Sequence, residues 1–124
     1  MIANNFASEG GYGGGICIYH NPGDSYTVSS GSSCVITRNI IRNNYIYRAG
    51  VQAGYGGGIY LEAYYGGNVY NVTENIIEGN GAEYGGGVYY YSDYEGTNGN
   101  FTDNVITGNS ANDSGGGLYL CNYY

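Results

Sequence analysis

Basic residues are scarce in this sequence, which contains no lysine and no tryptophan. Its three arginines, Arg38, Arg42 and Arg48, stand against ten acidic residues, and the formal net charge is −7. Nucleic-acid binding depends on cations that neutralise phosphates, and this chain has almost none to offer. The same balance argues against attraction to anionic membrane surfaces. The composition therefore predicts an acidic, solvated surface and no nucleic-acid partner.

Long apolar runs are also missing. No stretch approaches the roughly 20 apolar residues that a membrane-spanning helix needs. The first residues, MIANNFASEGG, lack the charged and then apolar pattern of a secretory leader. We therefore predict no membrane insertion, and the sequence leaves the export route open.

Catalytic and metal-binding motifs are absent from the sequence as well. None of the serine-nucleophile, zinc-protease, phosphate-loop or paired-cysteine motifs occurs. The single histidine, His20, precedes Asn-Pro-Gly, which is typical of a turn. The polar patches 93–95 and 112–114 lack the spacing of calcium loops and are expected to be solvated. We predict a protein that is not an enzyme and that has no catalytic residues, no cofactor and no metal site.

Glycine and tyrosine are abundant instead, with 25 and 18 copies in 124 residues. So much glycine would weaken an ordinary globular fold, because glycine loses the most backbone freedom on folding. Here the glycine is periodic. Triple glycine begins at Gly13, Gly56, Gly85 and Gly115, each time followed by a short apolar or aromatic segment. A period of roughly 30 residues is the signature of a repeat architecture.

A second motif precedes three of the glycine triplets. Residues 36–44, 72–80 and 101–109 align without gaps as apolar, Thr, X, Asn, apolar, Ile, X, X, Asn. β-branched residues, tyrosine and glycine dominate, and no stretch shows a sustained helical period. The sequence therefore predicts an all-β fold, a parallel β-solenoid of about four coils. We expect one domain over residues 1–124, with coils at approximately 1–35, 36–71, 72–100 and 101–124.

Such a stack places each residue above its equivalent in the next coil, about 4.8 Å away. Three inward apolar columns are predicted: Ile2, Ile41, Ile77 and Ile106; Ile36, Val72 and Phe101; and Ile16, Ile59, Val88 and Leu118. Two asparagine ladders are predicted at bends: Asn39, Asn75 and Asn104; and Asn5, Asn44, Asn80 and Asn109. Asparagine tolerates the left-handed conformation that bends require. A column with Thr37, Thr73 and Thr102 and another with Cys17, Tyr60, Tyr89 and Tyr119 are expected to face outward.

Two short motifs resemble those of a known family. FTDN (Phe101–Asn104) is similar to the FxxN motif of chlamydial-type polymorphic outer-membrane proteins, and GGGIY (Gly56–Tyr60) resembles their GGA-I motif. The wider pattern is similar to right-handed parallel β-helix repeats of the pectate-lyase-like superfamily. The resemblance implies a right-handed parallel β-helix in an extracellular or cell-surface protein. Proteins with this fold include polysaccharide lyases and hydrolases, but here the one column that combines a basic residue, Arg38, with acidic equivalents, Glu74 and Asp103, is expected to be a solvated stripe with ion pairs between coils.

The function predicted from the sequence is structural. The first and last coils both carry ladder residues, and no capping segment is recognised beside them. We therefore expect head-to-tail stacking of copies into an extracellular filament or surface fibre, with the chain itself as partner. The predicted assembly residues are Ile2, Asn5, Ile16, Cys17, Asn109, Leu118, Tyr119 and Cys121. The alternative is an adhesin-type passenger segment that binds a polysaccharide or a host surface through a tyrosine-rich face.

Cysteines and glycosylation sequons add two smaller expectations. The chain has three cysteines, an odd number, and Cys17 and Cys34 flank a long loop that a disulfide could close. Two unpaired thiols are the alternative. Asn71, Asn100 and Asn112 each begin an Asn-X-Ser/Thr sequon and are candidate sites for covalent glycans. Chance occurrence of these sequons is the competing interpretation.

Overall fold

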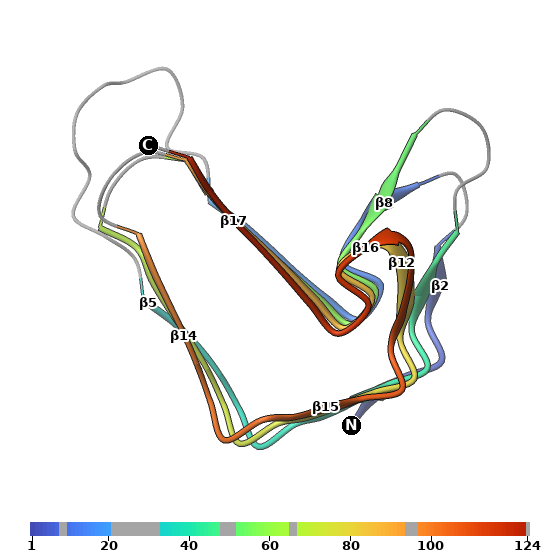
Figure 1. The fold of residues 1–124 in the computed structure, drawn as a ribbon. Helices are drawn as coiled ribbons and strands as arrows, with labels where there is room; N and C mark the ends of the chain where they lie inside the picture. Colours follow the sequence, from blue (N-terminus) through green and yellow to red (C-terminus); the bar gives the residue numbers. More distant parts are fainter. Residues whose placement is uncertain (8–9, 21–32, 48–51, 65–66, 94–96, 124) are drawn as a thin grey trace.

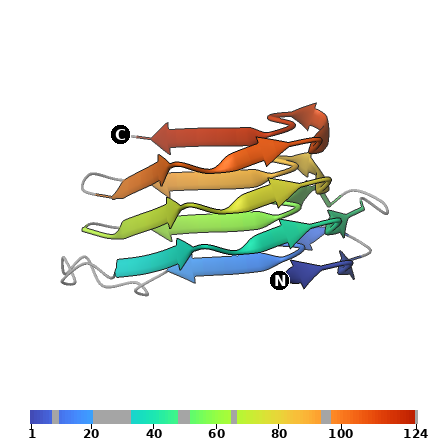
Figure 2. The ribbon, with the colours of Figure 1, turned by 90° about the horizontal axis from the view of Figure 1, so that it is seen from below.

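The structure is a computed structural model that describes residues 1–7, 10–20, 33–47, 52–64, 67–93 and 97–123. All regular elements in these ranges are β-strands, and every strand pair is parallel. No helix in the described part of the chain is long and apolar enough to cross a membrane. Seen along the stack in Figure 1, the strands repeat one bent outline, and in Figure 2 they form stacked levels.

The strands form four sheets. Sheet A contains β1 (Ile2–Ala3), β6 (Ile40–Arg42), β11 (Ile76–Glu78) and β15 (Val105–Thr107). Sheet D contains β5 (Ser33–Thr37), β10 (Val69–Thr73) and β14 (Asn98–Thr102). Sheet C contains β4 (Ile16–His20), β9 (Ile59–Tyr64), β13 (Val88–Asp93) and β17 (Leu118–Tyr123). Sheet B contains β2 (Phe6–Ala7), β7 (Tyr45–Ile46), β12 (Gly81–Tyr84), β8 (Gly54–Tyr55), β3 (Gly11–Tyr12) and β16 (Ser110–Ser114).

Strand neighbours within each sheet come from successive stretches of the chain. Ile41 pairs with Ile2 on one side and Ile77 on the other, and Ile77 pairs with Ile106. We call the strands at one level a layer. Layer 1 contains β1–β4, layer 2 β5–β9, layer 3 β10–β13 and layer 4 β14–β17. Parallel pairing between layers leaves equivalent residues of the repeat beside one another (Figure 2).

The main core lies between sheets A, C and D. The three apolar columns predicted from the sequence are confirmed as in-register pairs. All their members in the middle layers are buried, and Ile59, Ile77 and Val88 are 0% exposed. Side chains of one layer pack on their equivalents in the next, which removes apolar surface from water along the whole stack.

The asparagine ladders are also confirmed. The Asn75 backbone N–H donates to Asn104 Oδ1 at 3.0 Å, and the Asn75 side-chain amide donates to the Ile36 carbonyl at 2.8 Å. Asn80 makes the equivalent bonds to Asn109 Oδ1 and the Ile41 carbonyl. Asn75 and Asn80 thus each tie their own layer to both neighbours, which satisfies amide groups that would be costly to bury alone.

The left-handed conformation at these bends is not on the ladder asparagines, and this part of the prediction is wrong. It falls on the residue before each one, with φ of 56° at Arg38 and Glu74 and 54° at Asp103. At the other bend the equivalent positions are Asn4, Asn43, Gly79 and Gly108. The preceding residue makes the turn, so the ladder asparagine is free to point its amide inward.

Triple glycine forms the predicted corner. The first glycine of each triplet has a positive φ, from 63° to 71°. The second allows close approach between layers. A Cβ added at Gly57 would lie 2.5 Å from the carbonyl oxygens of Gly81 and Gly86, and a side chain there would clash with backbone. Glycine is therefore needed at this corner for two separate reasons, conformation and space.

Candidate binding groove

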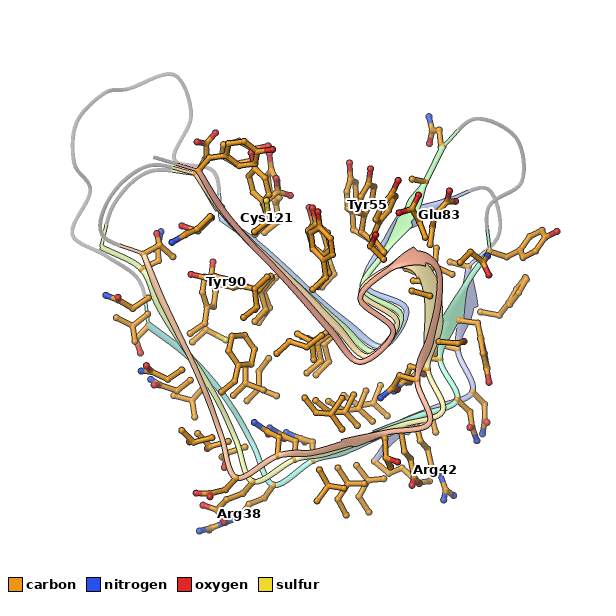
Figure 3. The ribbon with its side chains drawn as sticks, viewed as in Figure 1. Arg38, Arg42, Tyr55, Glu83, Tyr90 and Cys121 are labelled. Carbon is orange, nitrogen blue, oxygen red and sulfur yellow. The ribbon has the colours of Figure 1, made fainter. Side chains whose placement is uncertain are left out.

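Sheet B carries β3, β8 and β12 back toward the outer face of sheet C (Figure 3). Tyr12, Tyr55 and Tyr84 on these strands form one ladder of rings. A second ladder on sheet C contains Tyr60, Tyr89 and Tyr119. The two ladders meet, and we call the space that they line the tyrosine groove.

Rings within a ladder are nearly parallel. Tyr60 and Tyr89 have centroids 5.3 Å apart at an interplanar angle of 8°, and Tyr12 and Tyr55 are 5.7 Å apart at 16°. Rings of opposite ladders meet at steep angles. Tyr55 and Tyr89 lie 5.1 Å apart at 68°, an edge-to-face contact that aromatic pairs favour. The two ladders thus pack against each other as an aromatic cluster outside the main core.

Alternation along β9 explains the composition of the groove. Tyr60, Glu62 and Tyr64 point to the same side because successive side chains of a strand point to opposite faces. Register then places Tyr19 and Tyr91 beside Glu62 in the neighbouring layers. Tyr64 and Tyr91 lie 5.9 Å apart with rings tilted by 49°. One carboxylate is therefore surrounded by phenols.

Glu62 is the most unusual residue of the groove. It is only 7% exposed although it lies on the outer face of the sheet. Its Oε2 accepts a hydrogen bond from the Tyr60 hydroxyl. Burial raises the pKa of the Glu62 carboxyl, and the nearby Asp93 charge raises it further, while a hydrogen bond from Tyr64 opposes the change. The same hydrogen bond, together with burial, raises the pKa of Tyr64.

Two adjoining cavities open around this carboxylate. One has a volume of about 220 Å³ and is lined by Tyr12, Tyr55, Tyr60, Glu62, Tyr64, Tyr89 and Tyr91. The other has a volume of about 280 Å³ and adds Cys17 and Tyr19 to the lining. Burial and the Glu62 charge raise the pKa of the Cys17 thiol, so it carries less of the nucleophilic thiolate than an ordinary cysteine. Phenols, one carboxylate and a poorly activated thiol suit ligand binding better than covalent chemistry.

The eight predicted assembly residues all lie in the outermost described layers. Layer 1 contains Ile2, Asn5, Ile16 and Cys17, and layer 4 contains Asn109, Leu118, Tyr119 and Cys121. Cys17 and Tyr119 also border the tyrosine groove. Their role in assembly stays a prediction.

The predicted disulfide is not formed. Cys17 and Cys34 are free thiols, as is Cys121. Cys34 packs against the main core, whereas Cys17 pairs with Tyr60 on the outer face of sheet C. The two thiols therefore lie on different sheets, with Cys17 outward on sheet C and Cys34 inward on sheet D, which explains why flanking a loop was not enough to bring them together.

Two of the predicted glycosylation residues lie side by side on sheet D. Asn71 and Asn100 are paired in register, and the Asn100 side-chain amide donates to Asn71 Oδ1 at 2.9 Å. Asn112 is exposed on β16. Glycan attachment at these residues stays a prediction.

Sequence reasoning missed one half of the groove. It placed Tyr60, Tyr89 and Tyr119 in an outward column, and this register is confirmed. It did not foresee a facing ladder. The signal was present, because a tyrosine precedes the glycine triplet at Tyr12, Tyr55 and Tyr84.

Comparison of the chain with protein-family models, with curated proteins and with solved structures gave no match. The resemblance to polymorphic outer-membrane proteins therefore stays a prediction based on two short motifs.

Proposed function

We propose that the chain is a right-handed β-solenoid of four coils that acts as a structural subunit and stacks head to tail on further copies of itself. The observation that carries the proposal is the unbroken register of equivalent residues from layer 1 to layer 4. A right-handed path is supported by Figure 1, where the chain runs anticlockwise as it approaches the viewer. A surface repeated at equal steps can be continued by the same surface on another molecule.

Exposure of the last layer supports stacking. Leu61, Tyr90 and Leu120 occupy one inward column of sheet C. Leu61 is 0% exposed and Tyr90 6%, but Leu120 is 58% exposed because no described residue covers it. A further layer would bury Leu120 as Tyr90 is buried, with an expected gain of roughly 1–2 kcal/mol, because only part of this side chain is still exposed.

The asparagine ladder gives the stack a direction. Asn5 donates from its backbone N–H and its side-chain amide to Asn44 Oδ1, and Asn44 donates in the same way to Asn80. Every bond of this kind runs from a lower to a higher layer. Asn109 can therefore donate to the next molecule, where the Asn5 Oδ1 can accept. Complementary ends of this kind support head-to-tail contact, which continues as an open filament.

Electron microscopy and sedimentation of the purified protein test this function. Four layers should advance a filament by roughly 19 Å per copy, from the usual strand spacing. Leu120→Lys places a charge on the stacking surface and should abolish filaments. Val105→Lys is the matched control, because Val105 is 55% exposed in the same layer but points outward, and it should assemble normally. Wild-type protein that stays monomeric at high concentration, or a Leu120→Lys variant that forms the same filament, would contradict the proposal.

We also propose that this assembly lies outside the cell or on its surface, which the resemblance and the sequons support. The adhesin alternative, with a polysaccharide or host surface on the tyrosine-rich face, stays a second prediction. The tyrosine groove is the described feature that favours it, and its ligand chemistry can be argued separately from stacking.

A further inference from the structure

The tyrosine groove is a hollow that opens to solvent and has one acidic side chain, Glu62, in its lining. The cavity of about 220 Å³ is large enough for a small organic ligand, and its lining consists of tyrosines and Glu62. Tyr12 reaches it from β3, Tyr60 and Tyr64 come from β9, and Tyr91 comes from β13. Rings inclined at different angles therefore surround the carboxylate, as the 49° between Tyr12 and Tyr60 shows.

Glu62 lacks a basic partner among the described residues that line these cavities. The described arginines lie on the far side of the molecule from Tyr55 (Figure 3). Arg38 pairs with Glu74 at 2.9 Å, and Arg42 lies 3.9 Å from Glu78. A buried carboxylate without a cation is costly when ionised, and burial accordingly raises the Glu62 pKa. A ligand that supplies positive charge would relieve this cost.

We propose that the tyrosine groove binds an organic ammonium ion, with the cationic nitrogen beside the Glu62 carboxylate and the surrounding tyrosine rings in contact with its carbon atoms. Aromatic rings attract cations electrostatically, and the attraction strengthens when the site is shielded from water. The Glu62 carboxylate in the lining adds direct charge attraction to the cation. A neutral saccharide of similar size would leave the Glu62 charge uncompensated, so the geometry and charge favour the cation.

Calorimetric titration with tetramethylammonium chloride tests the proposal, with tert-butanol as a neutral probe of similar shape. Tetramethylammonium should bind and tert-butanol should not. Glu62→Gln should weaken binding about tenfold or more, because it removes the charge and keeps the shape. Glu78→Gln, which removes the same charge outside the groove, should leave the affinity within about twofold, as expected when only screened, distant charge is lost.

A second variant guards against misfolding of Glu62→Gln. Tyr12→Ala removes a ring that lines both cavities and is 59% exposed, so the fold should survive while the affinity falls. The proposal would be overturned if tert-butanol binds as tightly as tetramethylammonium, or if both groove variants keep the wild-type affinity. It would also be overturned if the protein binds the neutral saccharide cellotetraose but does not bind tetramethylammonium. Repeating the titration on Leu120→Lys separates this inference from stacking, because that substitution lies on the opposite face of sheet C from the groove.

Discussion

The two faces of β9 are buried to almost the same extent but contain opposite chemistry. On the inner face, Leu61 and Ala63 are 0% exposed and pack in the apolar core. On the outer face, Tyr60 is 2% exposed and Glu62 7%. The inner face is covered by sheets A and D, whereas the outer face is covered by the tyrosines of the returning sheet B. A strand that alternates between apolar and polar residues can therefore be buried on both sides.

The packing of the tyrosine ladders on the outer face of sheet C depends on close backbone approach at the glycine corner. Sheet B can return over sheet C only if the chain turns tightly at the triplets, where layers touch through glycine carbonyls. The inner core depends on side-chain volume instead. Substitutions should therefore distinguish the glycine corner from the inner core, and their expected effects on the free energy of unfolding differ in size.

The largest effect is expected for Gly57→Ala. The added methyl group would lie 2.5 Å from two backbone oxygens, so the corner must distort, and we expect a loss of about 4 kcal/mol in the free energy of unfolding. Gly116→Ala is the control at the equivalent corner of layer 4, where the nearest atom is 3.3 Å away. Denaturant unfolding measures both variants. Equal stability losses would show that space at this corner is not limiting.

Leu61→Ala tests the inner face. Removal of this fully buried side chain should cost about 3 kcal/mol of unfolding free energy, since it leaves a cavity between two packed layers. Binding of tetramethylammonium by the folded protein should change little, because the groove lies on the other face of the strand. A variant that retains its stability but loses the ligand would reverse our assignment of the two faces.

Titration of the Tyr70 hydroxyl should make the stability of the inner core depend on pH. Its hydroxyl donates to the Glu62 carbonyl at 3.1 Å, and burial raises the pKa of Tyr70 from 10.0 to about 12. The folded protein keeps this proton when the unfolded chain loses it, so stability should fall as pH rises from about 10 to about 12. The fall attributable to Tyr70 should be up to about 3 kcal/mol and should disappear in Tyr70→Phe. Identical pH profiles for the two proteins would contradict the assignment.

Titration of the Glu62 carboxyl on the outer face should change the stability by a smaller amount. Its pKa is raised above the ordinary 4.5 by burial, so the folded state holds the proton over a window in which the unfolded chain has lost it. Stability should therefore fall as pH rises through that window and then level off. The free energy of unfolding of wild type minus that of Glu62→Gln should follow this curve, with Glu78→Gln as the control for net charge. If that difference rises with pH instead, the groove stabilises the ionised carboxylate.

Much of the inner structure could be predicted because it depends on local periodicity. Ile36, Ile41 and their equivalents recur at fixed positions of the repeat, and alternation decides which side chains point inward. Asn39 and Asn44 could be placed at bends for the same reason. The left-handed residue was misplaced by one position because φ at a bend depends on backbone geometry that Asn, Arg, Glu, Asp and Gly all adopt here.

The outer groove could not be predicted because it depends on how sheet B returns. A tyrosine before three of the glycine triplets indicates a repeated column, but nothing local indicates that Tyr55 contacts Tyr60, from which it is separated in the sequence by the triplet and Ile59. Nor does the sequence around Glu62 indicate burial, since Tyr-Leu-Glu-Ala-Tyr reads as a strand with one solvated face. The cysteines are a related case: Cys17 faces outward from sheet C and Cys34 faces the core from sheet D, and both are free thiols, which was the alternative to the disulfide.

Register between layers is the central claim, and cysteine cross-linking tests it most directly. In a background with Cys17, Cys34 and Cys121 changed to serine, Thr37→Cys with Thr73→Cys places two thiols on paired residues whose hydroxyl oxygens lie 3.1 Å apart. Parallel neighbours fall within disulfide range, and mild oxidation should close an intramolecular bond. Thr37→Cys with Thr102→Cys spans two strand spacings, about 10 Å, and should not cross-link. Rapid bonding in the first pair alone would support the stacked layers, whereas equal bonding in both pairs, or none in the first, would contradict them.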